Sequence, residues 1–385
     1  MKGSKLKQLM TVAWQSALLV GITLSAVIPF SCRITAQGVQ LLGGDYAPPV
    51  LTDFTVVDEK TLRLEFTEKV KISGYVVAEV LDDEFDSMEH SSTLDLSPAI
   101  ERASGIYGSI PCSLEYEDND TVVKVIFENE MLVGQGYEFY SEVNDEIGNS
   151  LTMVLPFAGF NSRVPQLLMT EIQSESISSQ KSSEKKDGTY RNEFVEVLVL
   201  KGGNLAGLEL CSGYDGESKS YDFPVVEVET GEVFVVHLRN RGNGCISEES
   251  DDMAAAFSSY TSPLVRDLWT KSEATALGNK TDILILRNKA NGEVLDAVMY
   301  RASNIEAWTK TMLSFSQLLD DGTIYDSGDI ENAFITDSLT STKTLVRKNA
   351  KEYQTMALEN TPIEYPVYSD ADSWEVSAEP SPGEV

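Results

Sequence analysis

Two histidines are the only imidazole groups that this sequence offers for acid–base or nucleophilic chemistry. His90 precedes two serines, which indicates an exposed loop. His237 alternates with Val233 and Val235, which predicts a half-buried structural histidine on a strand. A metal site built from several histidines is therefore excluded, and neither histidine lies in a nucleophile or metalloprotease motif.

Carboxylates are the next residues that could do chemistry. Glu193 with Glu196, or Asp282 with Asp296, could form an acid–base pair. Such a pair must face one another at a defined separation, which the sequence does not supply. We interpret Glu193 and Glu196 as solvent-facing strand residues. The sequence therefore predicts no catalytic residue, and we expect the protein not to be an enzyme.

Acidic clusters occur at Asp82–Asp86, Glu117–Asp120 and Glu248–Asp252. Carboxylates at alternate loop positions could bind calcium, but none of these runs has the EF-hand spacing. We interpret them as solvated acidic loops and expect neither a metal ion nor a cofactor.

Tryptophans are the side chains best suited to hold a partner, because an exposed ring can stack on a sugar or anchor a peptide. Trp374 is expected in the core. Trp269 lies in a stretch, residues 239–280, that interrupts the strand pattern, and a short helix is expected around residues 264–269. Trp269 is therefore the predicted partner contact.

The charge balance limits the kinds of partner. The 385 residues contain 61 Asp plus Glu and 30 Lys plus Arg, a formal net charge of −31. This charge argues against nucleic-acid binding and against docking on anionic lipid head groups. A hydrophobic content of 42% is typical of globular chains, and the length suggests two domains.

The N-terminus reads as an export signal. Lys2, Lys5 and Lys7 form a basic segment, and residues 8–32 carry no charge. Cys32 follows the small Ser31, as in a bacterial lipoprotein signal.

We expect residues 1–31 to be removed and Cys32 to be acylated, with residues 32–47 forming a tether. Cleavage near Ala36 and an uncleaved anchor helix are the alternatives.

Export makes a disulfide conceivable. If Cys32 is acylated, Cys112, Cys211 and Cys245 remain. Cys211 and Cys245 fall in the same predicted domain and could pair, although a buried thiol is at least as compatible with the sequence.

Short runs of alternating or continuous apolar residues predict an all-β protein. In the first domain, residues 48–162, strands are expected at 61–66, 122–127 and 137–140. In the second domain, residues 164–385, a mobile loop is expected at 174–188. The strands of the second domain are expected at 167–172, 192–197, 207–210, 221–224, 231–238, 281–286 and 292–300.

Residues 48 to about 160 resemble the bacterial Ig-like domains of surface proteins. The matching stretches are Leu62–Val70, Gly136–Phe139 and Asp145–Leu151, which follow one another in the family's order. Residues 81–111 depart from the compact pattern and look like an insertion.

Residues 164–385 resemble the bacterial lamin-tail domain. The resemblance is carried by Thr170–Ile172, by the Glu193–Glu196 strand, and by the Asp296, Val298 and Tyr300 pattern. It continues through Leu345–Arg347, Asp372–Val376 and Pro380–Gly383. Residues 239–280 are an insertion relative to that pattern.

Together the resemblances imply two tandem Ig-like β-sandwiches behind a signal or anchor segment. They imply a non-catalytic lipoprotein of the bacterial cell envelope, anchored in a membrane through its lipid, that binds or scaffolds a protein or glycan partner. A passive envelope spacer and an accessory protein of an extracellular hydrolase are the alternatives that the sequence leaves open.

Overall fold

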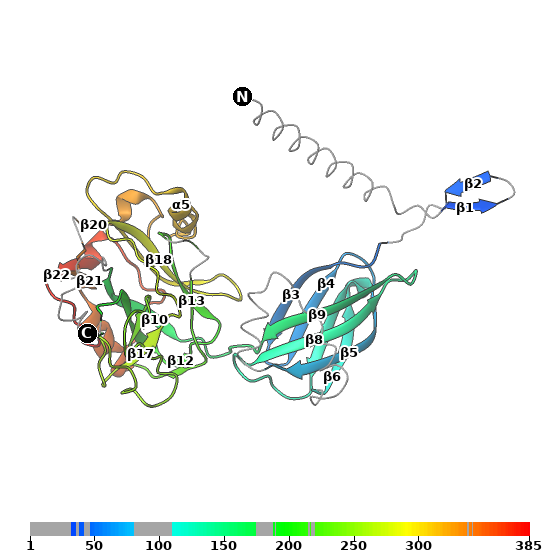
Figure 1. The fold of residues 1–385 in the computed structure, drawn as a ribbon, viewed down its shortest axis with the longest axis horizontal. Helices are drawn as coiled ribbons and strands as arrows, with labels where there is room; N and C mark the ends of the chain where they lie inside the picture. Colours follow the sequence, from blue (N-terminus) through cyan, green and yellow to red (C-terminus); the bar gives the residue numbers. More distant parts are fainter. Residues whose placement is uncertain are drawn as a thin grey trace, which may run out of the picture.

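The computed structural model consists of two β-sheet units joined in tandem (Figure 1). It describes residues 32–35 and 38–41 as backbone, and then residues 47–80, 110–174, 188, 190–214, 216, 220–336, 339–340 and 342–385. The all-β fold expected from the sequence is confirmed, because strands form six sheets and helices are short.

The first unit is a sandwich of a four-stranded and a three-stranded sheet, ordered β3-β4-β7-β6 and β5-β8-β9. The strands are antiparallel throughout. Their bounds are β3 (Leu51–Asp58), β4 (Thr61–Phe66), β5 (Lys71–Glu79), β6 (Cys112–Glu117), β7 (Val122–Phe127), β8 (Gly136–Asn144) and β9 (Ser150–Ala158). The 3-10 helix η2 (Asp118–Asp120) joins β6 to β7.

Alternation along the strands builds the core of the first unit. Leu62, Leu64 and Phe66 are buried, while the residues between them are partly exposed. Successive side chains of a strand point to opposite faces, so one face of each sheet meets the other in the interior. The core also contains Phe127 and Phe139.

The segment predicted as a tether contains a short hairpin, β1 (Cys32–Thr35) paired with β2 (Gly38–Leu41). The predicted signal segment before Cys32 lies outside the described residues, as do most of the predicted insertion at 81–111 and most of the predicted loop at 174–188. None of the helices in the described part of the chain has the length and apolar character needed to cross a bilayer.

The second unit is a larger sandwich of a six-stranded and a five-stranded sheet, ordered β17-β16-β11-β10-β21-β22 and β14-β13-β18-β19-β20. A two-stranded sheet pairs β12 with β15. The six-stranded sheet has β10 (Gln166–Gln173), β11 (Phe194–Lys201), β16 (Val233–His237), β17 (Arg266–Trp269), β21 (Thr344–Arg347) and β22 (Trp374–Ser377). The other strands are β12 (Gly203–Asn204), β13 (Leu208–Ser212), β14 (Tyr221–Asp222), β15 (Glu227–Val228), β18 (Thr281–Asn288), β19 (Val294–Arg301) and β20 (Phe334–Ile335).

The central strands of both sheets of the second unit are buried on both faces. A central core that includes Leu167, Val197 and Leu284 separates them. The outer face of the five-stranded sheet packs against Met312 and Phe315 of α5. The helices are α5 (Lys310–Gln317), α6 (Ala350–Leu358), η5 (Ile330–Asn332) and η6 (Ala371–Ser373).

The outer face of the six-stranded sheet is covered by several segments, which contribute Val265, Tyr353, Val367 and Val385. Every residue of β11 except Lys201 is therefore buried. Such continuous burial is typical of strands that are covered on both sides.

The predicted insertion at residues 239–280 is part of the sandwich. Its residues 266–269 form β17, which pairs in parallel with β16 at one edge of the six-stranded sheet. The short helix expected around residues 264–269 is wrong, because residues 266–269 form an edge strand instead.

Candidate functional site

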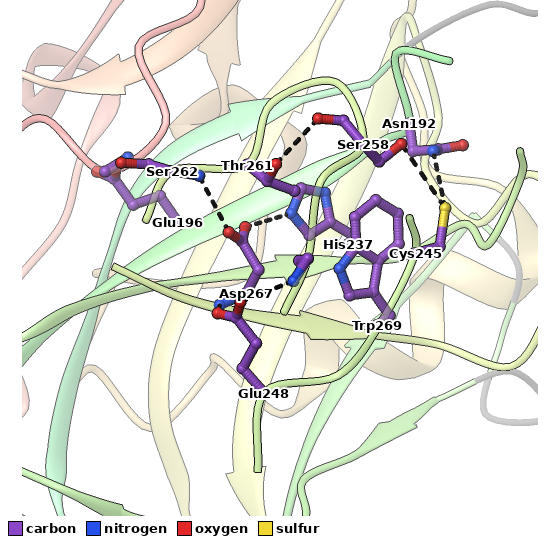
Figure 2. A network of polar contacts seen from close by, with 12 residues as sticks. Asn192, Glu196, His237, Cys245, Glu248, Ser258, Thr261, Ser262, Asp267 and Trp269 are labelled. Atoms are coloured by element: carbon purple, nitrogen blue, oxygen red, sulfur yellow. Dashed lines mark hydrogen bonds and ion pairs between the residues drawn. The ribbon is translucent and has the colours of Figure 1, made fainter. Parts of the chain in front are cut away.

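A polar cluster lies on the outer face of the six-stranded sheet, where β17, β16, β11 and β10 run side by side. The register aligns Phe194, His237 and Trp269 in one row across β11, β16 and β17. A second row contains Asp267, Val235 and Glu196, and Glu196 lies opposite Glu171 of β10. Figure 2 shows the part of this cluster around His237.

His237 is fully buried rather than half-buried. Its Nε2 lies 2.6 Å from Asp267 Oδ1, and its ring stacks on Trp269 with centroids 3.8 Å apart (Figure 2). Phe194 contacts the imidazole edge-on. A buried imidazole paired with a carboxylate and packed against rings supports the structural role predicted from the sequence.

Asp267 connects the edge strand to the loop before it. Its Oδ2 accepts the backbone N–H of Ser262 at 3.1 Å, and its own N–H donates to Glu248 Oε2 at 2.8 Å. Glu248 Oε1 accepts the N–H of Ala256 at 2.9 Å. Two buried carboxylates therefore fix the course of residues 246–265 through backbone N–H groups, as Figure 2 shows for Glu248, Asp267 and Ser262.

Trp269 is not a surface residue, so its prediction as a partner contact is wrong. It is 5% exposed. Residues 266–269 join the sheet as β17, and successive side chains of a strand point to opposite faces. The side chain of Trp269 lies on the outer face of the sheet, where it stacks against His237. The backbone N–H of Trp269 is bound by Ser247 Oγ at 2.8 Å, which closes the sheet edge. Trp374 is buried in the core, as expected.

Cys211 and Cys245 are not joined by a disulfide; both are thiols. Cys211 lies on β13 in the outer core beneath α5. Cys245 contacts Arg241 O at 3.5 Å and Ser258 Oγ at 3.7 Å, next to the six-stranded sheet. Cys211 lies in the five-stranded sheet and Cys245 in the loop beside the six-stranded sheet, and the pairing that the sequence left open does not form.

Adding a reductant to protein that was purified without one is therefore expected to leave its thermal unfolding midpoint unchanged. Loss of a native disulfide typically destabilises a domain by about 2–5 kcal/mol, which would lower the midpoint by several degrees. The measurement compares melting curves with and without dithiothreitol, together with thiol counting on the unfolded chain. A midpoint that falls on reduction would contradict the arrangement of Cys211 and Cys245.

Glu193, Glu196 and Asp282 are buried, which corrects the interpretation of the two glutamates as solvent-facing. Burial raises the pKa of each to about 7. Glu193 and Glu196 are three positions apart, so on a strand they point to opposite faces and cannot act as a pair. The burial of Glu196 could have been predicted from the residues of β11 on either side of it, which are apolar up to Leu200. Apolar residues at successive positions of a strand indicate that both faces of the strand are covered.

Each of these carboxylates holds backbone N–H groups of a loop. Glu193 Oε2 accepts from Ala276 and Leu277 at 2.9 and 3.1 Å. Asp282 accepts from the N–H groups of Gly278 and Tyr214 at 2.9 and 2.8 Å. A raised carboxyl pKa is a mark of active sites, but each of these carboxylates accepts hydrogen bonds from the protein's own donors and is buried from solvent.

Asp296 forms a buried ion pair with Arg347, with Nη2–Oδ1 and Nη2–Oδ2 distances of 3.2 and 3.3 Å. Asp296 Oδ2 also accepts the N–H of Met169 at 2.6 Å. The Arg347 guanidinium donates to Met169 O and lies over the Trp374 ring, 4.5 Å from its centroid. These motif residues therefore link β10, β19, β21 and β22 across the core.

The acidic clusters have separate outcomes. The run at 82–86 and His90 lie outside the described residues. In the run at 248–252, Glu248 points inward rather than to solvent. Within the described ranges, no group of three or more His, Cys, Asp or Glu side chains is arranged to hold a metal ion.

The family model described as "TP_1001_2nd: protein second domain" matches residues 165–376, more than half of the chain. The chain belongs to this family, whose matched region coincides with the second sandwich. An uncharacterized protein of Treponema pallidum (strain Nichols) is 28% identical over 175 residues, 45% of this chain and 41% of that protein. The match thus spans less than half of the relative's length.

Solved structures show weaker likeness. A DUF4876 family protein from Bacteroides thetaiotaomicron VPI-5482 is 11% identical, covers 78% of this chain and 86% of its own, and has a TM-score of 0.27. The N-terminal part of the bacterial S-layer protein SbsC is 13% identical and covers 66% of this chain and 43% of its own, with a TM-score of 0.22. Values this low carry no argument about the function of the chain.

Proposed function

We propose that this protein is a non-catalytic lipoprotein of the bacterial cell envelope whose second sandwich binds a protein partner. The observation that carries the binding role is a set of exposed apolar side chains on one loop. Ile246, Phe257 and Leu264 are 44%, 63% and 85% exposed, and all three lie between β16 and β17. We call these three residues the apolar loop residues.

The loop that presents them is fixed before any partner arrives. The carboxylates of Glu248 and Asp267 accept backbone N–H groups of the loop, and Phe257 N–H donates to Gly244 O at 3.0 Å. A loop that is already ordered loses little conformational entropy on binding, which favours affinity. Exposed apolar side chains on such a rigid support are typical of protein contacts.

The chemistry of this surface favours a protein over a glycan. Sugar rings are bound by stacking on exposed aromatic faces, and the tryptophan that suited this role, Trp269, is buried against His237. Two of the three apolar loop residues are aliphatic. Anchoring through Cys32 rests on the basic and apolar segment before it in the sequence.

Phe257→Ser or Leu264→Ser is expected to weaken partner capture by about tenfold or more, because an apolar anchor in an interface typically contributes more than ~1.4 kcal/mol. The measurement is in-cell crosslinking of the mature protein followed by quantitative mass spectrometry of the captured proteins. The mass of the first mature residue in the same samples tests the acylation of Cys32.

Leu358→Ser is the matched control, because Leu358 is 65% exposed on α6, outside the loop. It should capture the partner as the natural protein does. Equal capture by all variants would remove the loop from the interface. Absence of any reproducible partner would favour a passive spacer. Deleting residues 239–280 would not be informative, because the deletion removes β17.

A further inference from the structure

The segment Ser381–Glu384 lies across the outer face of the six-stranded sheet as a strap. Ser381 N–H donates to Glu171 Oε1 at 3.0 Å, and Gly383 N–H donates to Glu196 Oε2 at 2.6 Å. The backbone N–H of Glu384 donates to Ser381 O at 3.0 Å, which closes a turn within the strap. Two carboxylates of the sheet therefore provide the polar anchors of the strap.

The fit of the strap to the sheet is close. Gly383 has a φ of +87°, and a Cβ atom added there would lie 2.8 Å from Val265 Cγ2. A side chain at this position would be strained and would collide with the residue that precedes β17. Val385 packs on the outer apolar cluster. The strap thus also covers the base of the loop that carries the apolar loop residues.

Glu171 and Glu196 are direct cross-strand partners on adjacent strands, and both are buried. Within the described part of the chain, their hydrogen bonds come from Ser and Thr hydroxyls and backbone N–H groups, and neither makes an ion pair with Lys or Arg. Two adjacent buried carboxylates with no cation cannot both ionise without a large electrostatic penalty, so such a pair tends to retain one proton.

The groups that face the pair come from every neighbouring element. Thr170 Oγ1 donates to Glu196 Oε1 at 2.6 Å. The hydroxyl of Thr344 on β21 lies beside Glu171 and donates to Ile172 O at 2.7 Å. Along the same row of the sheet, the nearest charged residues are Asp267 of β17 and Glu375 of β22, each separated from the pair by a valine. His237 is engaged by Asp267, and the strap itself adds Glu384.

We propose that Ser381–Glu384 is a proton-linked strap, which docks on the Glu171–Glu196 pair when the pair holds a proton and loosens when both carboxylates ionise. When the strap lifts, water reaches the pair and both carboxylates can ionise without the penalty. Docking is therefore coupled to proton uptake, and a rise in pH favours release. Burial raises the pKa of both glutamates, that of Glu196 to about 7, which sets release near and above neutral pH.

The test is hydrogen exchange of the full chain, with amide-resolved mass spectrometry of residues 378–385 from about pH 5.5 to about pH 8.5. Protection factors corrected for intrinsic exchange are expected to fall as the pH rises through 7, by at most about tenfold per pH unit, the limit for one linked proton. In Glu196→Gln, whose amide stays neutral, the protection of the strap should not depend on pH. The amides of β10 and β11 report in the same spectra whether each variant is folded.

Glu193→Gln is the matched control. Glu193 is buried directly before the same strand and its pKa is also raised to about 7, but it holds residues 276–277 instead of the strap. It should keep the pH dependence of the strap. The proposal is overturned if strap protection in the natural protein is independent of pH, if it changes only in step with the β11 amides, or if Glu196→Gln leaves the slope unchanged.

Discussion

Raising the pH from about 5 to about 8 is expected to lower the free energy of unfolding of the second sandwich by several kcal/mol. Glu193, Glu196 and Asp282 are responsible, because burial raises the pKa of each to about 7 in the folded chain. The corresponding pKa values in the unfolded chain are near 4. Between these limits the folded state binds more protons than the unfolded state, so stability falls as the pH rises.

The size of the effect is large for a protein. A shift from about 4.5 to about 7 corresponds to about 3 kcal/mol for one glutamate when it is fully ionised. Three such groups approach the entire stability of a typical domain, about 5–15 kcal/mol. The hydrogen bonds that these carboxylates accept limit the loss, and the decrease is complete once the pH exceeds the folded-state pKa.

The measurement is urea unfolding at several pH values, with tryptophan fluorescence as the readout. Glu196→Gln is the control, since Thr170 Oγ1 can reverse its hydrogen bond to the amide. The free energy of unfolding of this variant should fall less with rising pH, by the contribution of one carboxyl group. At pH 8 the variant should be at least as stable as the natural protein. The high net negative charge acts in the same direction, but it is nearly the same in both proteins. Equal slopes would exclude Glu196 as a contributor.

Arg347→Met is expected to lower the free energy of unfolding by about 3–5 kcal/mol, because it leaves the Asp296 carboxylate buried without its cation. The substitution also removes the donor to Met169 O and the guanidinium packed over Trp374. Methionine keeps most of the side-chain volume, so the expected loss is mainly electrostatic. Denaturant unfolding measured through Trp374 and its neighbours reports the change.

Arg163→Met is the matched control for an exposed ion pair. Arg163 makes two hydrogen bonds with Glu227, at 2.7 and 2.6 Å, but both side chains are more than half exposed. Its removal should change stability by about 0–1 kcal/mol, because solvent screens the pair. If the double variant Arg347→Met with Asp296→Asn were no more stable than Arg347→Met alone, an uncompensated Asp296 charge would not explain the loss.

The predicted strands of the first sandwich were recognisable because one face of each sheet is exposed, whereas β3, β5, β6 and β9 were not predicted. The residues predicted at 61–66 and 122–127 form β4 and β7 with the same bounds. Alternation of apolar and polar residues is a local pattern in the sequence, and it is present wherever only one face of a strand is covered. In the second sandwich the strand positions were also largely correct, but the faces of their polar residues were not.

The polar cluster could not be derived from the sequence, because its burial depends on segments distant in the chain. From the sequence alone, Glu196 is interpreted as a solvent-facing strand residue, but in the structure residues 381–385 cover it. From the sequence alone, Trp269 is interpreted as a loop residue, but in the structure the parallel pairing of β17 with β16 places it against His237. Parallel pairing of this kind leaves little local mark, because its partners are joined by a long connection.

The central position of β10 determines how the second sandwich would respond to pulling. A chain held at its N-terminal side transmits tension into the second unit through Pro165, directly before β10. This strand is hydrogen-bonded to β11 on one side and to β21 on the other. Tension along β10 loads both rows of hydrogen bonds in shear, all at once, instead of opening them one by one from a sheet edge. A domain with this arrangement resists pulling from its N-terminal side and gives way abruptly rather than by gradual unravelling.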